Sequence, residues 1–246
     1  MGLVSAQADN FISKAAAWQA RIDLAAAHRL ADRQGFSEGI FNHFTLAVPD
    51  MHDRYLQIPF GLHWSEVTAS CLIEVGYDGR LLRGIGDVER SAFCIHAPIH
   101  RLLPSAACVL HTHMPFASAL ALTVDRALDT RLSQNAMRFH GRIAVDGAYN
   151  GLALDAGEGE RIARAMGGAD IAFLGNHGVV VCGARMAHAY DDLYYLERAC
   201  MVQVLAQSTG RPLAPVDEHL ARRVGEQAAG ERLQSELFFE ALRRSL

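Results

Sequence analysis

The 246-residue sequence contains no run of about 18 consecutive apolar residues, which a membrane-spanning helix requires. Its first segment, "MGLVSAQADNFISK", lacks the basic stretch followed by an apolar stretch that is typical of a secretory signal. Acidic and basic residues are interspersed around a formal net charge of -4, so no basic stripe is available for a phosphate backbone. We therefore expect a soluble cytoplasmic protein that binds neither membranes nor nucleic acid.

Paired cysteine motifs are also missing. The five cysteines are odd in number, lie in apolar surroundings and form no C-x-x-C pair. This pattern predicts reduced thiols rather than a disulfide framework or a zinc knuckle. The cysteines are Cys71, Cys94, Cys108, Cys182 and Cys200.

The sequence has no internal repeat, no low-complexity segment and no long linker, and 50% of its residues are hydrophobic. A chain of this size can bury one large core, so we expect a single domain over residues 1–246.

Hydrophobic periodicity and chain breakers predict an α/β organisation. An Ala-rich helix is expected over residues 11–34, ending at Gly35, and a hairpin of two strands is expected in "CLIEVGYDGRLL" (71–82). From about residue 184 to the end, two long helices are expected, over 184–208 and 216–245. Further strands are predicted at 40–48, 54–59, 106–113, 142–147, 170–178 and 179–183. The pattern favours helices that cover a largely antiparallel sheet.

Two histidines one residue apart end an apolar run in "CVLHTH" (108–113). Alternate residues of a strand point to the same face, so His111 and His113 can direct their imidazoles at one point. Such a pair can also simply hydrogen-bond to backbone or water. In "LGNHGVVVCG" a third histidine, His177, lies at a tight connection between strands. Three histidines at strand ends favour an open site for a divalent metal, with zinc as the expected ion and manganese or iron as alternatives.

Other histidines have weaker claims to a site. His96 and His100 are spaced to share one helical face, but Pro98 lies between them and no glutamate follows His96, so we assign them a structural role. His43 and His63, in loops or at strand ends, are candidates for the pocket wall.

Several motifs in the observed order resemble the class II aldolase and adducin head-domain family, in its adducin-like bacterial branch. They are "FNHFTLAVP", "IPFGLHWSEVTASCLIEV", "FCIHAPIHRLLPSAACVLHTH", "YNGLA", "LGNHGVVVCG" and "AYDDLYYLERAC", spread over residues 23–204. The resemblance implies a three-layer α/β/α sandwich around a mainly antiparallel sheet, usually in a homotetramer with active sites at subunit boundaries. It also implies metal-ligand roles for His111, His113 and His177.

In the sugar-phosphate aldolases of the family, the metal binds the substrate carbonyl and stabilises an enediolate, while an upstream glutamate moves the proton. The corresponding position here is Ala92, and Glu89 lies one helical turn earlier. Glu89 is therefore a catalytic candidate, or else a favourable charge at a helix N-terminus. Position alone makes His140 and Tyr149 replacement proton donors.

The phosphate-binding loops of those aldolases correspond here to segments that keep Asn42 and Gly61 but carry Phe41 and Phe60. A phosphate needs several N–H and O–H donors, so the phenylalanines point to a flat or aromatic substrate, or to core packing. Arg90, next to Ser91, is either a ligand for a substrate carboxylate or an exposed arginine of a first helical turn.

We therefore predict a metal-dependent lyase that cleaves or forms a carbon–carbon bond adjacent to a carbonyl, by aldol cleavage or decarboxylation through a metal-stabilised enolate. Its substrate is expected to be small, without phosphate, and able to carry a carboxylate. The alternatives are a non-catalytic adducin-like scaffold and a three-histidine iron oxygenase. The C-terminal helices are expected to pack partly against neighbouring subunits of the homotetramer.

Overall fold

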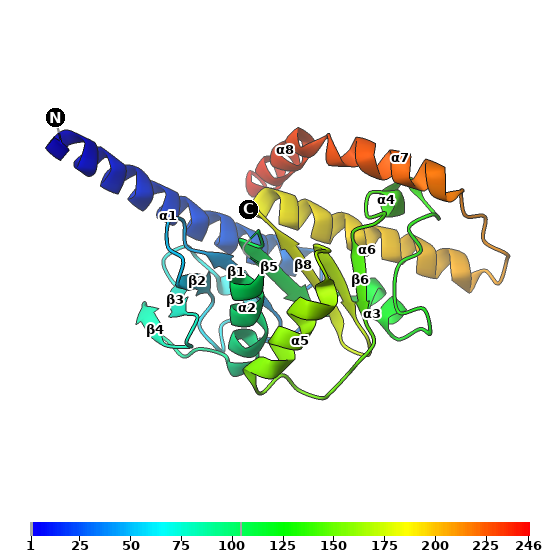
Figure 1. Ribbon diagram of the computed structural model, residues 1–246, viewed down its shortest axis with the longest axis horizontal. Coiled ribbons are helices and arrows are strands. Elements are labelled where there is room, and N and C mark those ends of the chain that lie inside the picture. The colour runs from blue at the N-terminus through cyan, green and yellow to red at the C-terminus, as the bar shows by residue number, and fades with distance from the viewer. Residues whose placement is uncertain (1, 104) are drawn as a thin grey trace.

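The computed structural model describes residues 2–103 and 105–246, with side chains from residue 14 onward except that of Ala156. Eight strands form one sheet in the order β4-β3-β2-β1-β5-β8-β7-β6 (Figure 1). Six of the seven neighbouring pairs are antiparallel, and β6 with β7 is the parallel pair. The strands are β1 (His43–Ala47), β2 (Arg54–Gln57), β3 (Ile73–Gly76), β4 (Leu81–Arg83), β5 (Cys108–Thr112), β6 (Ile143–Asp146), β7 (Ile171–Leu174) and β8 (Gly178–Gly183). The predicted hairpin around the Gly-Tyr-Asp-Gly turn is the β3–β4 pair.

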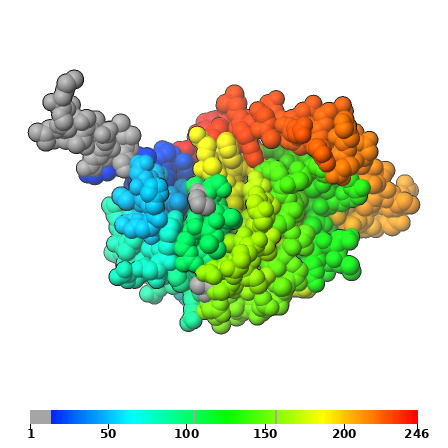
Figure 2. Space-filling model, viewed as in Figure 1, coloured from blue at the N-terminus to red at the C-terminus, as the bar shows by residue number. Residues whose placement is uncertain are grey.

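Helices cover both faces of the sheet. On the face turned toward the viewer in Figures 1 and 2 lie α2 (Arg90–Leu102) and α5 (Ala156–Met166). Behind it lie α1 (Gly2–Arg33), α3 (Pro115–Ala121) and α6 (Met186–Ser208). Short helical turns are η1 (Trp64–Glu66) and α4 (Gln134–Met137). The expected three-layer α/β/α sandwich is confirmed.

The alternation of side chains along β5 divides the core in two. Val109 joins the apolar cluster under α2 and α5, whereas Cys108 and Leu110 join the cluster under α1 and α6. Because period-2 alternation continues along the strand, His111 shares the α2 face with Val109. On the neighbouring strand, His43 lies opposite His111 in the register and belongs to the same face. The fold thus places these imidazoles beneath the start of α2.

The last part of the chain differs from the sequence prediction. The expected helix over 216–245 is divided into α7 (Glu218–Ala229) and α8 (Arg232–Arg243). The break falls at Gly230, a residue with poor helix propensity, which caps α7. The division lets α8 turn back onto α6, where Phe239 packs against Tyr190.

A buried acidic pair on α6 fixes this return. Asp192 accepts hydrogen bonds from Arg232 of α8 at 2.8 and 3.0 Å and from Arg142 at 2.6 Å. Its neighbour Asp191 accepts a hydrogen bond from Ser235 of α8 at 3.0 Å and pairs with Arg138. Both carboxylates are almost fully buried, so their charges require these partners.

The structure also bears on the expected reduced cysteines and the expected lack of a membrane-spanning helix. All five cysteines carry free thiols, and four of them are buried. Among the described residues, no helix is both long enough and apolar enough to cross a membrane.

Candidate metal centre

Three histidines converge at one end of β5. His111 is in β5, His113 follows that strand, and His177 lies in the turn between β7 and β8. One nitrogen from each ring can be chosen so that all three lie within 4.8 Å of one another. The ring centroids are 4.8 to 5.2 Å apart. Rings at this separation can share one ion.

Backbone geometry around His177 permits this convergence. Asn176 adopts the left-handed conformation, with φ at +59°, and makes the tight turn. A Cβ atom on Gly178 would lie 2.7 Å from the Thr112 carbonyl oxygen and 2.8 Å from Cδ2 of His113. Only glycine therefore allows the turn to approach the end of β5 this closely.

Hydrogen bonds select which ring nitrogen is available. Nδ1 of His111 lies 3.0 Å from the Val179 carbonyl oxygen, to which it donates. Nδ1 of His113 donates to Oε2 of Glu38. Because both Nδ1 atoms are engaged, Nε2 is the nitrogen left for an ion in each ring.

The environment keeps the rings of His111 and His177 neutral. Burial, together with the neighbouring His177 and His113, lowers the pKa of His111 well below its usual value. Burial and the neighbouring His113 lower the pKa of His177 to about 4. Neutral imidazole is the form that binds metals, and three imidazoles suit zinc, manganese or iron. The residues present therefore fit a divalent ion.

The three histidines line a pocket of about 460 Å³. Its walls combine apolar side chains with a few polar ones, and none of the described residues that line it is lysine or arginine. The apolar part comes from Phe41, Ile95, Leu152 and Ala153, and further polar groups come from Glu38, Asn42, His43, Ser91, Tyr149 and Asn176.

Besides the three histidines, Phe41, Asn42, His43, Ser91 and Tyr149 were singled out in the sequence and lie in this pocket wall. Asn42 has φ at +68°, and its Oδ1 accepts a hydrogen bond from the backbone N–H of His113 at 2.6 Å. Tyr149 is half-exposed at the rim, with its ring centroid 6.1 Å from that of His177. Ser91 lies at the start of α2 and donates to Glu89 at 2.7 Å.

Glu89 lies immediately behind the pocket. It is the N-cap of α2, where its Oε2 accepts from the Ala92 amide at 2.5 Å. The same oxygen lies 3.0 Å from Nε2 of His43, which lines the pocket. Burial alone would raise the pKa of Glu89, but the contacts with His43, the Ala92 amide and Ser91 outweigh burial and lower the pKa to about 2. Glu89 therefore combines a helix-capping position with contact to the pocket wall.

Other residues singled out in the sequence lie outside the pocket wall of this chain. The imidazole of His140 lies 2.9 Å from the Thr130 hydroxyl and 3.0 Å from the Glu218 carboxylate. Arg90 is exposed and donates to the Leu154 carbonyl oxygen at 2.9 Å, while Gly61 forms a turn with φ at +89°. The fourth, His63, caps η1 instead.

Glu38 is the site residue that sequence reasoning missed. It lies 75 positions before His113 in the chain, in a loop without periodicity, and only the folded structure brings the two together. Leu152, which also lines the pocket, lies within the quoted motif "YNGLA" but was given no predicted role of its own.

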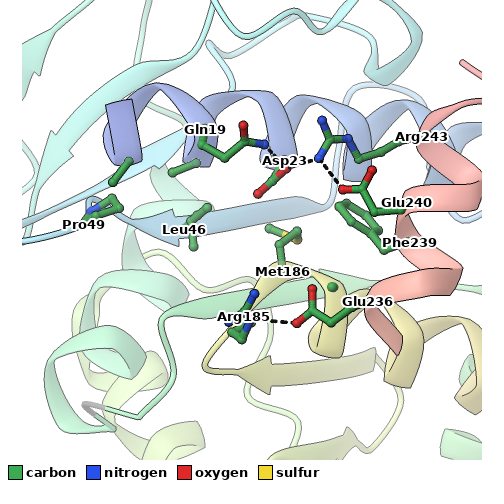
Figure 3. Close-up of a pocket in the computed structure, with 13 residues that line it drawn as sticks. Gln19, Asp23, Leu46, Pro49, Arg185, Met186, Glu236, Phe239, Glu240 and Arg243 are labelled. Carbon is green, nitrogen blue, oxygen red and sulfur yellow. Dashed lines mark hydrogen bonds and ion pairs between the residues drawn. The ribbon is translucent and has the colours of Figure 1, made fainter. Parts of the chain in front are cut away.

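A larger hollow of about 720 Å³ lies elsewhere, between α1, the start of α6 and α8 (Figure 3). Its charged side chains pair with one another: Arg185 with Glu236 at 2.7 Å, and Arg243 with Asp23 at 3.0 Å. Because these charges are already matched, the histidine pocket is the better candidate for chemistry.

Comparisons with known proteins agree with this geometry. The profile of the family described as "Class II Aldolase and Adducin N-terminal domain" matches residues 22–204. The crystal structure of an aldolase II superfamily protein from Pseudomonas syringae superposes with a TM-score of 0.86, at 34% identity over 94% of this chain and 92% of that one.

Two Streptomyces proteins are also similar over most of their lengths. Decarboxylase NovR of Streptomyces niveus is 32% identical over 82% of this chain and 75% of its own length. The 4-hydroxy-3-prenylphenylpyruvate oxygenase/4-hydroxy-3-prenylbenzoate synthase of Streptomyces roseochromogenus is 33% identical over 82% of this chain and 73% of its own length. The profile match over residues 22–204 and the similarity to these relatives show that the chain belongs to the class II aldolase and adducin family.

Proposed function

We propose that the protein is a divalent-metal-dependent lyase that forms or cleaves a carbon–carbon bond next to a carbonyl, by aldol cleavage or decarboxylation. The observation that carries the proposal is the convergence of the three imidazoles of His111, His113 and His177 in the lining of a pocket of about 460 Å³. A divalent ion held there would act as a Lewis acid toward a carbonyl oxygen that gains negative charge. We expect zinc as the ion, with manganese and iron as alternatives for the same donors.

The residues around the triad suggest how a proton is handled. The pair of Glu89 and His43 presents an imidazole ring to the pocket, with a carboxylate behind it. Tyr149 offers a phenol at the rim, and the hydrogen bonds of His140 to Thr130 and Glu218 make it a weaker candidate within one chain. We propose Glu89, acting on the pocket through His43, and Tyr149 as the proton-transfer groups.

The pocket wall suggests a substrate without phosphate. A phosphate dianion would meet the Glu38 carboxylate and no cationic side chain of the described wall. Phe41 and Leu152 instead offer apolar surface to a flat or aromatic body. Because Arg90 bonds to Leu154, we propose that it supports the loop that carries Leu152, and that any substrate carboxylate is recognised elsewhere.

The names of two relatives support different versions of this chemistry. The similarity to decarboxylase NovR favours carbon dioxide release. The similarity to a protein named as an oxygenase favours a second candidate, an iron-dependent oxygenase at the same histidines. The two differ in their need for O₂.

The experiment begins with metal analysis of the purified protein, of His111→Ala and of the control His140→Ala. We expect one divalent ion per chain in the wild type and in the control, and loss of that ion from folded His111→Ala. Equal metal in all three proteins would contradict the assignment of the triad, and a metal-free wild type would favour the scaffold alternative.

Wild-type protein is then screened with hydroxy-keto acids and aromatic carboxylic acids for release of carbonyl compounds or carbon dioxide, in air and under anaerobic conditions. The lyase predicts equal rates in both. Activity that disappears without O₂ would instead establish the oxygenase.

We also propose a homo-oligomer, in keeping with the tetramers typical of the family. Apolar side chains lie exposed on α6 and α8, including Val202, Leu205, Leu233 and Leu237. Light scattering after size exclusion should give a multiple of 26.8 kDa. A monomer would contradict this proposal.

A further inference from the structure

A second, much smaller cavity lies behind the metal pocket, between the start of α2 and strands β1 and β2. Three of the residues that line it, His43, Gln57 and Glu89, are polar, and the others are apolar. The room for solvent inside is about 10 Å³. One water molecule needs roughly 10 to 15 Å³ measured in this way. The cavity therefore has the size of a single water site.

Buried polar atoms in its walls have no protein partner. Gln57 is 2% exposed, and its Oε1 accepts no hydrogen bond from the described residues. Both ring nitrogens of His43 are also buried and form no hydrogen bond with the described residues, although Nε2 lies 3.0 Å from Oε2 of Glu89. A buried polar group without a hydrogen bond is unfavourable, so most such groups in proteins have a protein or water partner. The unpartnered Oε1 of Gln57 beside a cavity of this size indicates a polar occupant that can donate a hydrogen bond to it.

The contacts of Glu89 are divided unequally between its two oxygens. Oε2 accepts from the Ala92 amide at 2.5 Å and from Ser91 at 2.7 Å, and it lies 3.0 Å from Nε2 of His43. Oε1 of Glu89 takes part in no hydrogen bond or ion pair among the described residues. A carboxylate oxygen can accept about two hydrogen bonds. Oε1 is thus a free acceptor of a residue that lines the cavity.

We propose that this cavity holds one fixed water molecule, which donates its two hydrogens to Oε1 of Gln57 and Oε1 of Glu89. Gln57 then becomes a positioning residue: the water fixes the Glu89 carboxylate, which in turn holds the imidazole of His43. The His43 ring lies 6.0 Å, centroid to centroid, from that of His111. The water site stands independently of the reaction, whereas its importance for catalysis rests on the proposed function.

The test compares the wild type with Gln57→Leu and with Ile58→Val. Leucine removes the amide of Gln57 but keeps an apolar body of similar length, whereas Ile58→Val enlarges an apolar wall of the same cavity without touching a polar atom. The first measurement is a high-resolution crystal structure of each. We expect a single density peak within about 2.5 to 3.0 Å of Gln57 Oε1 and of Glu89 Oε1 in the wild type and in Ile58→Val. In Gln57→Leu the peak should be absent.

The second measurement is the ¹⁵N NMR spectrum of the histidine rings, taken on metal-free protein. The ring signals of His43 should shift in Gln57→Leu and stay unchanged in Ile58→Val. An empty cavity in the wild-type map overturns the water site even if the leucine variant does not fold. A water that persists in Gln57→Leu, or unchanged His43 signals, overturns the role of Gln57. Neither readout uses activity or metal content, so failure here is distinct from failure of the proposed function.

Discussion

Replacing Glu38 with glutamine tests how the histidines of the proposed metal site are oriented. Glu38 accepts the Nδ1 proton of His113, so its charge favours the tautomer that turns Nε2 toward an ion. Removing such an outer partner typically weakens metal binding about 10- to 100-fold. Because the Glu38 side chain is 60% exposed, solvent screens its charge, and we expect the lower end of that range. Glu38→Gln should therefore bind zinc about tenfold more weakly, or by about 1.4 kcal/mol.

The assay is competition with a chromogenic chelator at low salt and constant pH. Glu66→Gln is the matched control, because Glu66 accepts a backbone hydrogen bond at η1 and does not line the pocket. Zinc affinity of Glu38→Gln within about twofold of the wild type, or an equal loss in the control, would refute the reasoning.

Three further perturbations address the frame around the site. Arg232→Met leaves the buried Asp192 paired with Arg142 alone and should lower the free energy of unfolding in urea by about 2 to 3 kcal/mol. The control Arg222→Met removes an exposed arginine and should change it by less than about 0.5 kcal/mol. Equal effects would contradict a stabilising role for the buried pair of Arg232 and Asp192. Burial lowers the pKa of His28 and of His100 from 6.5 to about 4, so below pH 6.5 the unfolded chain binds more protons than the folded one. Stability should fall as the pH decreases from about 6.5 to about 4, and equal urea midpoints at pH 7 and pH 5 would disprove this. Gly178→Ala should lose bound metal and lower the free energy of unfolding by about 1 to 3 kcal/mol, because the added Cβ would collide with the end of β5. The control Gly147→Ala should keep its metal, since the nearest atom to its new Cβ is 3.8 Å away. Metal retained in both variants would contradict the tight fit of the turn.

The parts of the site that lie on strands were predictable from sequence. The spacing of His111 and His113 places both on one face because alternation along a strand is a local property. His177 was recognisable because a histidine between Asn176 and Gly178 indicates a tight turn. The reduced cysteines and the β3–β4 hairpin follow from equally local signals.

The parts that depend on distant contacts were not predictable. Glu38 reaches His113 only after β1 and β5 pair, and no local pattern encodes that contact. His140 appeared suitable by position, but the return of α7 provides Glu218 as its partner. The sequence does not show whether Gly230 interrupts the helical pattern over 216–245. The helix ends there because α8 packs against α6, which is a distant contact.

One histidine of the proposed metal site and much of the pocket wall come from different kinds of structure. His111 is held in the central sheet, whereas Phe41, Tyr149 and Leu152 lie in connecting segments outside the strands. Loops accept substitutions and changes of length far more readily than central strands do. Substitutions in these loops can therefore change what enters the pocket while His111 keeps its place in the sheet, so one fold can accept different reactants.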